Sequence, residues 1–278
     1  MREGEEMGRF DGVMILTDMD GTLLDSQSRL SPENRRAILR FIQQGGRFSV
    51  ATGRVKRAME YFLPELPLNA PAVLFNGSAV YDFQQGKTVW EKPLDHGPAL
   101  IFAQDIMARF PWAGVEVFLA EDEYVAQNSD RTRRHFQFIR LELKERDILE
   151  IPQPWVKFNL TGQSEQMGEL ADYCQSRYGD RYFMQFSTPD FYEVMAAGAN
   201  KGAGALAVCQ ICGVSPDHLY TLGDGYNDKE LMECARLSFA PENAVEPICR
   251  LAHKILPDND RHALAAAVQQ LEELYPEK

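Results

Sequence analysis

Short apolar segments alternate with amphipathic, helix-like segments in the first third of the chain. Residues 13–17, 47–51 and 72–75 have strand length and are dominated by apolar side chains. A Ser-Pro pair at 31–32 is typical of a helix start, with Ser as the N-cap, and a Gly-Gly pair at 45–46 marks the helix end. The pattern therefore predicts strands separated by helices.

The last third repeats this alternation. Strands are predicted at Leu219–Leu222, 237–240 and Lys254–Leu256, and helices at Lys201–Cys212, 228–235 and 263–275. Strands that alternate with helices form parallel sheets that are covered on both faces. The two thirds together predict an α/β fold, a doubly wound, mostly parallel Rossmann-like sheet.

The middle third, residues 86–190, has a different pattern. Its candidate strands are more amphipathic, and two helix-like stretches interrupt them; the strands are 114–119, 123–125, 155–160 and 182–186, and the helices 98–110 and 164–178. Such a mixture is typical of an α+β unit whose sheet has helices on one face. We therefore predict a core domain from residues 1–85 and 191–278, with an inserted α+β domain at 86–190.

Composition and charge exclude several classes of partner. The formal net charge is −12, and affinity for nucleic acid depends chiefly on Lys and Arg, so we expect no nucleic-acid partner. No apolar stretch approaches the ~20 residues of a membrane span, and residues 1–12 lack the apolar core of a signal peptide. The five cysteines include Cys209 and Cys212, which fall in a helical apolar pattern and indicate reduced thiols. These features predict a cytoplasmic protein, as a monomer or homodimer.

Polar side chains follow the predicted strands at the points where the strands end. Asp18 and Asp20 follow the first strand, Thr52 the second, Asn76 the third, and Asp224 follows the strand Leu219–Leu222. In an open α/β sheet, ligands bind beyond the carboxyl ends of the strands. We therefore expect these side chains to meet at one edge of the sheet.

Lys201 adds a basic group to this set. Asn200 is a candidate N-cap, which places Lys201 in the first helical turn, where a cation opposes the helix dipole. A phosphate or carboxylate nearby would reverse that cost, whereas an exposed Lys at a frayed helix start is the simpler alternative. Other members also have simpler interpretations, since Thr52 and Asp228 suit helix starts and Asn76-Gly77 suits a turn.

At this point the chain resembles a known family. Four segments match, in order, the four motifs of the haloacid dehalogenase-like hydrolases: Asp18-x-Asp20-Gly21-Thr22-Leu23-Leu24, Ala51-Thr52-Gly53-Arg54, Asn200-Lys201-Gly202 and Gly223-Asp224-Gly225-x-Asn227-Asp228. Phe75-Asn76-Gly77, Glu242-Asn243-Ala244 and the mid-chain insertion make it similar to the Cof-type subfamily, class IIB, which carries a C2 cap. The resemblance covers nearly the whole chain.

The resemblance implies a catalytic role for four side chains. Asp18 would attack phosphorus and form an aspartyl-phosphate, and Asp20 would protonate the leaving oxygen and then activate water. Thr52 and Lys201 would bind phosphoryl oxygens.

The resemblance also implies a Mg²⁺ cofactor. The metal would be held by the Asp18 carboxylate, the Asp20 backbone carbonyl and Asp224, with Asp228 and Asn227 in support. Physically, a cation is needed because a carboxylate must approach a phosphate that is also negatively charged.

Other residues of the matched motifs are expected to bind substrate. Gly53, Asn76 and Asn227 join Thr52 and Lys201 in that set. Arg54 has two open interpretations, a structural ion pair or a substrate contact.

The insertion would act as a cap that excludes water and contacts the leaving group. Candidates for that contact, which the sequence does not rank, are Trp112, Trp155, Lys157 and Tyr192. The five histidines lie outside the matched motifs, and we interpret them as structural or surface residues.

Three functions remain open at this stage. The first is a Mg²⁺-dependent phosphatase that acts on small phosphorylated metabolites such as sugar phosphates or phosphorylated cofactors. The second is a phosphomutase, which uses the same site and returns the phosphoryl group to substrate. The third is a non-catalytic protein that binds a phosphorylated ligand, although a pure binder has no need of Asp20.

Overall fold

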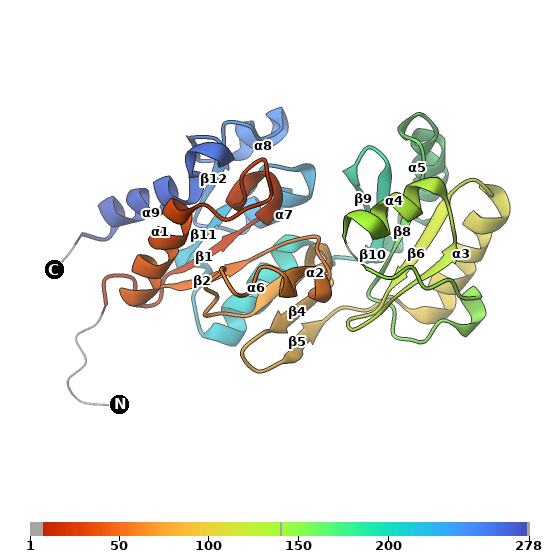
Figure 1. The fold of residues 1–278 in the computed structure, drawn as a ribbon, viewed down its shortest axis with the longest axis horizontal. Helices are drawn as coiled ribbons and strands as arrows, with labels where there is room; N and C mark the ends of the chain where they lie inside the picture. The colour runs from red at the N-terminus through yellow and green to blue at the C-terminus, as the bar shows by residue number, and fades with distance from the viewer. Residues whose placement is uncertain (1–7, 140, 277–278) are drawn as a thin grey trace.

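The computed structural model describes residues 8–139 and 141–276, which form two lobes joined by two crossings of the chain (Figure 1). The core lobe contains both ends of the described chain, and the insertion forms the other lobe. The polar N-terminal stretch, residues 1–12, lies partly outside the described residues. Within the described part of the chain, no helix is long and apolar enough to cross a membrane.

The core sheet is parallel throughout. Its order is β13-β12-β11-β1-β2, from β1 (Met14–Thr17), β2 (Arg47–Val50), β11 (Leu219–Leu222), β12 (Leu237–Pro241) and β13 (Lys254–Leu256). Successive strands run outward in one direction from β1 and in the other from β11. The strand order therefore reverses between β1 and β11, and such a switch point is where open α/β sheets bind ligands.

A small antiparallel sheet continues the core beyond β2. It contains β3 (Ala72–Leu74), β4 (Ala79–Asp82) and β5 (Lys87–Glu91), and the parallel bridge between Ala51 and Val73 joins it to the end of β2.

Helices cover both faces of the core sheet, as a doubly wound fold requires. Ile15 of β1 packs in the cluster that includes α1 (Pro32–Gln43) and α9 (Ala263–Leu274). Its neighbours Met14 and Leu16 pack in the cluster of the opposite face, which includes α6 (Lys201–Cys212). Successive side chains of β1 thus pack against the helices on opposite faces of the sheet. The shorter core helices are α2 (Lys56–Glu60), α7 (Lys229–Glu233) and α8 (Glu246–Leu251).

The predicted N-cap residues cap the first turns of α1 and α6. Ser31 accepts a hydrogen bond from the backbone N–H of Asn34, and Pro32 is the first helical residue. Asn200 likewise accepts from the N–H of Ala203, so Lys201 does begin α6.

The inserted lobe is an antiparallel sheet with two helices on one face. Its order is β7-β6-β8-β10-β9, from β6 (Gly114–Phe118), β7 (Glu123–Gln127), β8 (Lys157–Thr161), β9 (Tyr182–Thr188) and β10 (Phe191–Ala196). The helices α3 (His96–Arg109) and α5 (Ser164–Tyr178) pack on one face, and α4 (Asp130–Phe138) lies on the other side of the sheet (Figure 1).

Two predicted limits of the insertion are wrong. β10 pairs with both β8 and β9, so the inserted sheet continues past residue 190. At the other limit, residue 85 falls inside the hairpin of β4 and β5, which belongs to the core. Both errors arise because strand pairing, rather than local composition, decides which lobe a segment joins.

The inserted sheet places polar side chains on the face away from α3 and α5. Phe158 and Leu160 of β8 pack in the core of the lobe, whereas Lys157 and Asn159 line the cavity beneath the sheet. We refer to this second face as the cap wall.

Candidate active site

The two predicted aspartates of the core follow neighbouring strands at the switch point. Asp18 directly follows β1, and its N–H donates to Leu222 O at 2.9 Å, at the end of β11. Asp224 lies two residues beyond that end. The prediction that these strand ends meet is therefore realised in the parallel register of β1 and β11.

Three carboxylates gather at this point. Asp18, Asp224 and Asp228 each offer one oxygen, and these oxygens lie within 4.8 Å of one another. Thr22 donates from its hydroxyl to Asp224 Oδ1 at 2.5 Å. Gly21 permits this approach, since it has φ +82° and a Cβ there would lie 2.4 Å from Asp224 Oδ2.

Lys201 is fully buried against this acidic cluster. Its Nζ donates to Asp18 Oδ1 at 2.5 Å and to Asp228 Oδ1 at 2.6 Å. The second oxygen of Asp228 accepts the backbone N–H groups of Asp224 and Gly225, each at 2.9 Å. The alternative of an exposed Lys at a frayed helix start is thus wrong, because two carboxylates compensate the cation.

The acidic cluster has a deficit of positive charge. Burial raises the pKa of Asp18 well above its usual range, although Lys201 opposes the shift. Burial also raises the pKa of Asp224 to about 6, with the Thr22 hydrogen bond opposing. Burial alone would lower the pKa of Lys201, but attraction to Asp18 and Asp228 raises it. Lys201 compensates only one of the three carboxylate charges, and a divalent cation would compensate the other two. Carboxylate oxygens are ligands that suit Mg²⁺.

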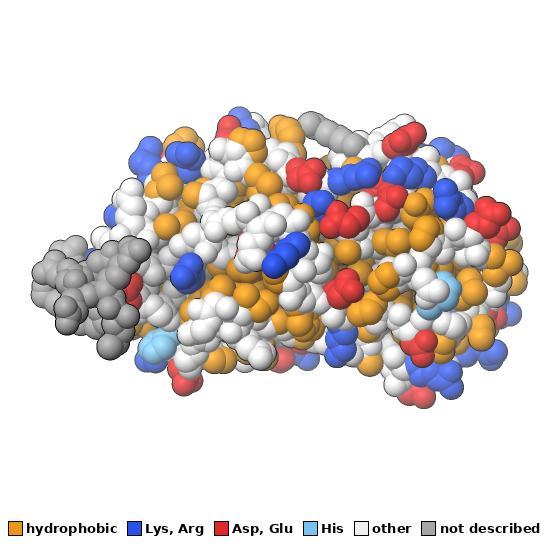
Figure 2. Space-filling model, turned by 90° about the horizontal axis from the view of Figure 1, so that it is seen from below, with side chains coloured by type: hydrophobic (Ala, Val, Ile, Leu, Met, Phe, Trp, Pro, Cys, Tyr) orange, Lys and Arg blue, Asp and Glu red, His pale blue; other side chains and the backbone are white. Residues whose placement is uncertain are grey.

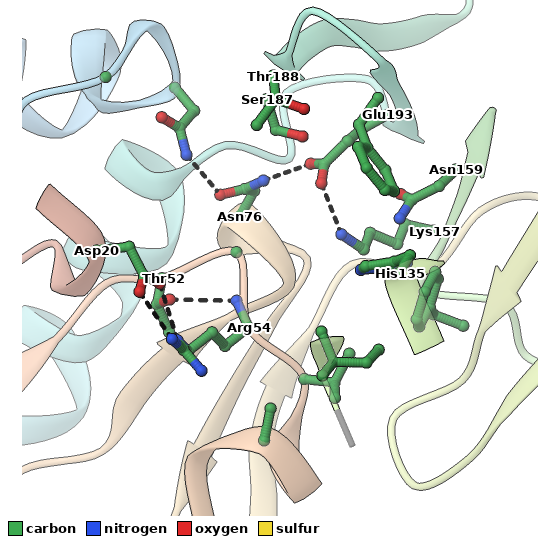
Figure 3. Close-up of a pocket in the computed structure, with 18 of the residues that line it drawn as sticks. Asp20, Thr52, Arg54, Asn76, His135, Lys157, Asn159, Ser187, Thr188 and Glu193 are labelled. Carbon is green, nitrogen blue, oxygen red and sulfur yellow. Dashed lines mark hydrogen bonds and ion pairs between the residues drawn. The ribbon is translucent and has the colours of Figure 1, made fainter. Parts of the chain in front are cut away.

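Asp20 lies outside the acidic cluster. Its carboxylate is half exposed and accepts two hydrogen bonds from Arg54, from Nε at 2.8 Å and from Nη2 at 2.7 Å (Figure 3). The Arg54 guanidinium also stacks on the Phe62 ring, 4.6 Å from its centroid. Of the two interpretations left open for Arg54, the structure contains the ion pair.

Thr52 and Asn76 line the floor of the site between the two lobes. Thr52 is buried, and its hydroxyl oxygen accepts the Arg54 N–H at 3.1 Å, which leaves the hydroxyl hydrogen for donation. Asn76 accepts from Asn227 Nδ2 at 3.0 Å and donates to Glu193 of the inserted lobe. Gly53 lies beside Asn76, where a Cβ would be 3.0 Å from the amide.

A cavity of about 370 Å³ opens between these core residues and the cap wall. Asp18, Asp20, Thr52, Gly53, Asn76, Asp224 and Asn227 line it from the core. All the predicted site residues therefore lie at this cavity or in the acidic cluster beneath it, which holds Lys201 and Asp228.

Ion pairs hold the lobes together at the side of the cavity. Arg57 of α2 lies 3.3 Å from the buried carboxylate of Glu123, and the neighbouring Lys56 pairs with Glu121. Figure 2 shows basic side chains beside acidic ones along the middle of the molecule, where the lobes meet. This contact joins α2 to the hairpin of β6 and β7.

The inserted lobe places residues at the cavity that the sequence did not single out, beside the predicted Lys157. Figure 3 shows His135, Asn159 and Glu193 around Lys157, to the right of the core residues Asp20, Thr52 and Arg54. Lys157 donates to Glu193 Oε1 at 2.8 Å, and His135 Nδ1 lies 2.8 Å from Glu116 Oε2. His135 therefore lines the cavity while it is held by Glu116, a placement that the sequence did not predict.

Only one of the four aromatic or basic cap candidates reaches the cavity. Lys157 lines it, whereas Trp155 and Tyr192 are buried in the core of the inserted lobe and Trp112 packs against that core. The period-two alternation of polar and apolar residues in β8 is the signal that could have identified Lys157 and Asn159 together.

Comparison with known families agrees with the motifs. A family model described as haloacid dehalogenase-like hydrolase matches residues 15–268. Among solved structures, a haloacid dehalogenase-like hydrolase from Bacteroides thetaiotaomicron has a TM-score of 0.81 at 22% identity, covering 94% of this chain and 99% of that one. A sugar phosphatase of haloacid dehalogenase subclass IIB also has a TM-score of 0.81, at 16% identity, covering 93% of this chain and 98% of that one.

The curated relatives are identical to this chain at about a quarter of the aligned positions. The HMP-PP phosphatase of Klebsiella pneumoniae is 26% identical over 250 residues, 88% of this chain and 90% of that protein. The chloroplastic endoribonuclease YBEY of Arabidopsis thaliana is 27% identical over 278 residues. That match covers 91% of this chain but only 45% of the Arabidopsis protein, so the chain spans less than half of that relative.

Proposed function

We propose that this chain, which belongs to the haloacid dehalogenase-like hydrolase family, is a Mg²⁺-dependent phosphatase of small phosphorylated metabolites. The observation that carries the proposal is the acidic cluster of Asp18, Asp224 and Asp228 around the buried Lys201, at the floor of a cavity between two lobes. Relatives named as phosphatases, such as the HMP-PP phosphatase, support the same reaction class.

Asp18 is the proposed nucleophile. Lys201 donates to its Oδ1, so we assign Oδ2 to the attack on phosphorus. The new Oδ2–P bond forms as the bond from phosphorus to the leaving oxygen breaks, which gives an aspartyl-phosphate. Water then attacks phosphorus, the bond to Asp18 breaks, and phosphate is released.

Asp18, the Asp20 carbonyl and Asp224 would hold Mg²⁺, with Asp228 in support. When bound, the ion supplies positive charge that offsets repulsion between the nucleophilic carboxylate and the phosphate. Asp228 already accepts from Lys201 and two backbone N–H groups, so its role is to fix the geometry of the cluster. Thr52 would donate its hydroxyl hydrogen to a phosphoryl oxygen.

Asp20 is the proposed acid and base. Its carboxyl group lies at the cavity, outside the acidic cluster, where Arg54 orients both oxygens. From there it would give a proton to the leaving oxygen and later take one from the attacking water. Gly53, Asn76 and Asn227 complete the proposed substrate-binding set beside Thr52 and Lys201.

A panel of phosphate esters tests this proposal. Phosphate release is measured with Mg²⁺, with EDTA, and with the variants Asp18→Asn and Asp20→Asn. We expect EDTA and Asp18→Asn to abolish release, and Asp20→Asn to slow turnover by at least about 100-fold. Equal release by wild type and Asp18→Asn would remove the nucleophile assignment. Activation by a bisphosphate with little net release of phosphate would instead indicate a phosphomutase.

Ligand binding without turnover would distinguish the third alternative, a non-catalytic binding protein, from the two enzymes. A protein that only binds a phosphorylated ligand would show calorimetric binding across the panel and no Asp18-dependent release. The compartment and the oligomeric state, which the sequence predicts as cytoplasmic and as monomer or homodimer, remain part of the proposal. Size-exclusion chromatography with light scattering measures the second of these.

A further inference from the structure

One amide in the floor of the site bonds with both lobes. Asn76 lies just beyond β3 and is fully buried, and its Nδ2 donates to Glu193 Oε2 on β10 of the inserted lobe (Figure 3). Its Oδ1 accepts from Asn227 Nδ2 at 3.0 Å, in the loop that carries Asp224 and Asp228. Asn76 therefore links the inserted lobe to the loop of the acidic cluster.

The backbone around Asn76 is unusual for the residues that it contains. Phe75 and Asn76 both have positive φ, +52° and +54°. Such values are uncommon outside glycine, above all for a bulky side chain, and they persist where the surrounding structure requires them. Gly53 lies against the amide, since a Cβ there would be 3.0 Å from Asn76 Nδ2 and 3.0 Å from Asn76 Oδ1. The chain thus adopts an unfavourable conformation that holds this amide in one place.

The core by itself does not decide which way this amide faces. Within residues 8–139 and 141–276, the hydrogen-bond partners of the Asn76 side chain are Asn227 and Glu193. Asn76 and Asn227 each carry one carbonyl oxygen and one NH₂ group, so either amide can donate to the other. If both amides turned over, the hydrogen bond between them would be kept, with donor and acceptor exchanged. The core contact therefore allows two directions.

Glu193 removes this ambiguity. Lys157 donates to Glu193 Oε1 at 2.8 Å, and both side chains of this ion pair are buried. An ionised carboxylate only accepts hydrogen bonds, so Asn76 must turn its NH₂ group toward Glu193 and its oxygen toward Asn227. Asn227 then donates, and its Oδ1 lies beside Gly225, where a Cβ would be 2.7 Å from that oxygen.

We propose that Glu193 is a positioning residue for the core site, and that its carboxylate fixes the direction of the Asn76 amide and, through it, of the Asn227 amide. Both asparagines line the cavity and belong to the proposed substrate-binding set. Their direction decides where a bound phosphate ester meets NH₂ groups and where it meets oxygens. The consequence for catalysis rests on the proposed phosphatase function, whereas the fixed direction of the amides does not.

The variant Glu193→Gln tests the amide direction with almost no change in shape. Its new amide oxygen would accept from Lys157, so its NH₂ group would face Asn76, and both asparagine amides should turn over. Proton–nitrogen correlation NMR of the full chain without ligand detects the side-chain amides, and Asn76→Ser and Asn227→Ser identify the two signals. We expect Glu193→Gln to move the Asn227 signal as well as the Asn76 signal, because the described contacts link Glu193 to Asn227 through Asn76.

Glu121→Gln is the matched control for this experiment. Glu121 also pairs across the lobes, with Lys56 rather than with Asn76. The control should leave both signals in place. An Asn227 signal that stays unmoved in Glu193→Gln would overturn the inference. So would an equal movement in Glu121→Gln, because any weakened contact between the lobes would then have the same effect.

A double-mutant cycle tests the consequence for the reaction. Hydrolysis of p-nitrophenyl phosphate with Mg²⁺ gives kcat/KM for wild type, Glu193→Gln, Asn76→Ala and the double variant. We expect each single change to lower kcat/KM about fivefold, the scale of one hydrogen bond, and the double variant to match Asn76→Ala. Effects that multiply would mean that Glu193 acts independently of Asn76 and would reject the positioning role. Absence of hydrolysis in wild type would count against the phosphatase proposal alone, because the NMR signals still decide the amide direction.

Discussion

We expect the affinity for Mg²⁺ to fall at low pH, by an amount that depends on the carboxyl pKa values of the acidic cluster. Burial raises the pKa of Asp224 to about 6. A carboxylate binds Mg²⁺ only when it is ionised, so binding competes with protonation below that pKa. Nearly all of the group is ionised at about pH 7.5 and about one tenth at about pH 5, which predicts an affinity about tenfold weaker at the lower pH. The pKa of Asp18 is raised as well, so its protonation weakens binding further in the same direction.

Titration calorimetry with Mg²⁺ at the two pH values measures this effect. Asp224→Asn should bind more weakly at neutral pH, and its remaining pH dependence should be smaller. Without metal, a raised carboxyl pKa means that folding favours the protonated form, so the stability that Asp224 contributes is present at low pH and lost as pH rises through about 6. Mg²⁺ should therefore raise the Tm more at neutral pH than at pH 5. An affinity that does not change between the two pH values would refute the reasoning.

Three further predictions follow from the same contacts. Lys201→Met leaves buried carboxylates without their cation and should cost roughly 3–5 kcal/mol of stability, which Mg²⁺ partly restores; an unchanged Tm without metal would contradict this. Gly21→Ala places a Cβ against Asp224 at positive φ, so calorimetry should detect weaker Mg²⁺ binding, and wild-type affinity would show that the turn relaxes freely. Arg57→Ala removes a partly exposed ion pair with Glu123 between the lobes and should raise KM only about twofold. Added salt should abolish the difference in KM between wild type and variant, and a difference that persists in high salt would reject an electrostatic role.

Local patterns and motifs were enough to predict the architecture of the core and the family. Helix starts at Ser31 and Asn200 depend on side chains within a few residues, so local patterning was sufficient to place α1 and α6. The doubly wound sheet followed from the alternation of strands and helices and is confirmed by the structure, as the family is by the matching family model. The convergence of Asp18 and Asp224 was predictable because parallel strands end at one edge.

The cap wall and the limits of the insertion depend on contacts between segments that are distant in the sequence. Glu116, Asn159 and Glu193 lie on three strands, and nothing within each strand's own sequence specifies which residues stand opposite one another. The same holds for β10, whose partners are chosen by long-range pairing, and for His135, which reaches the cavity because α4 packs over β6. Register between distant strands is fixed by the burial of whole faces, a property of the assembled sheet, so local pattern could predict the core residues of the candidate site but not the cap wall that faces them.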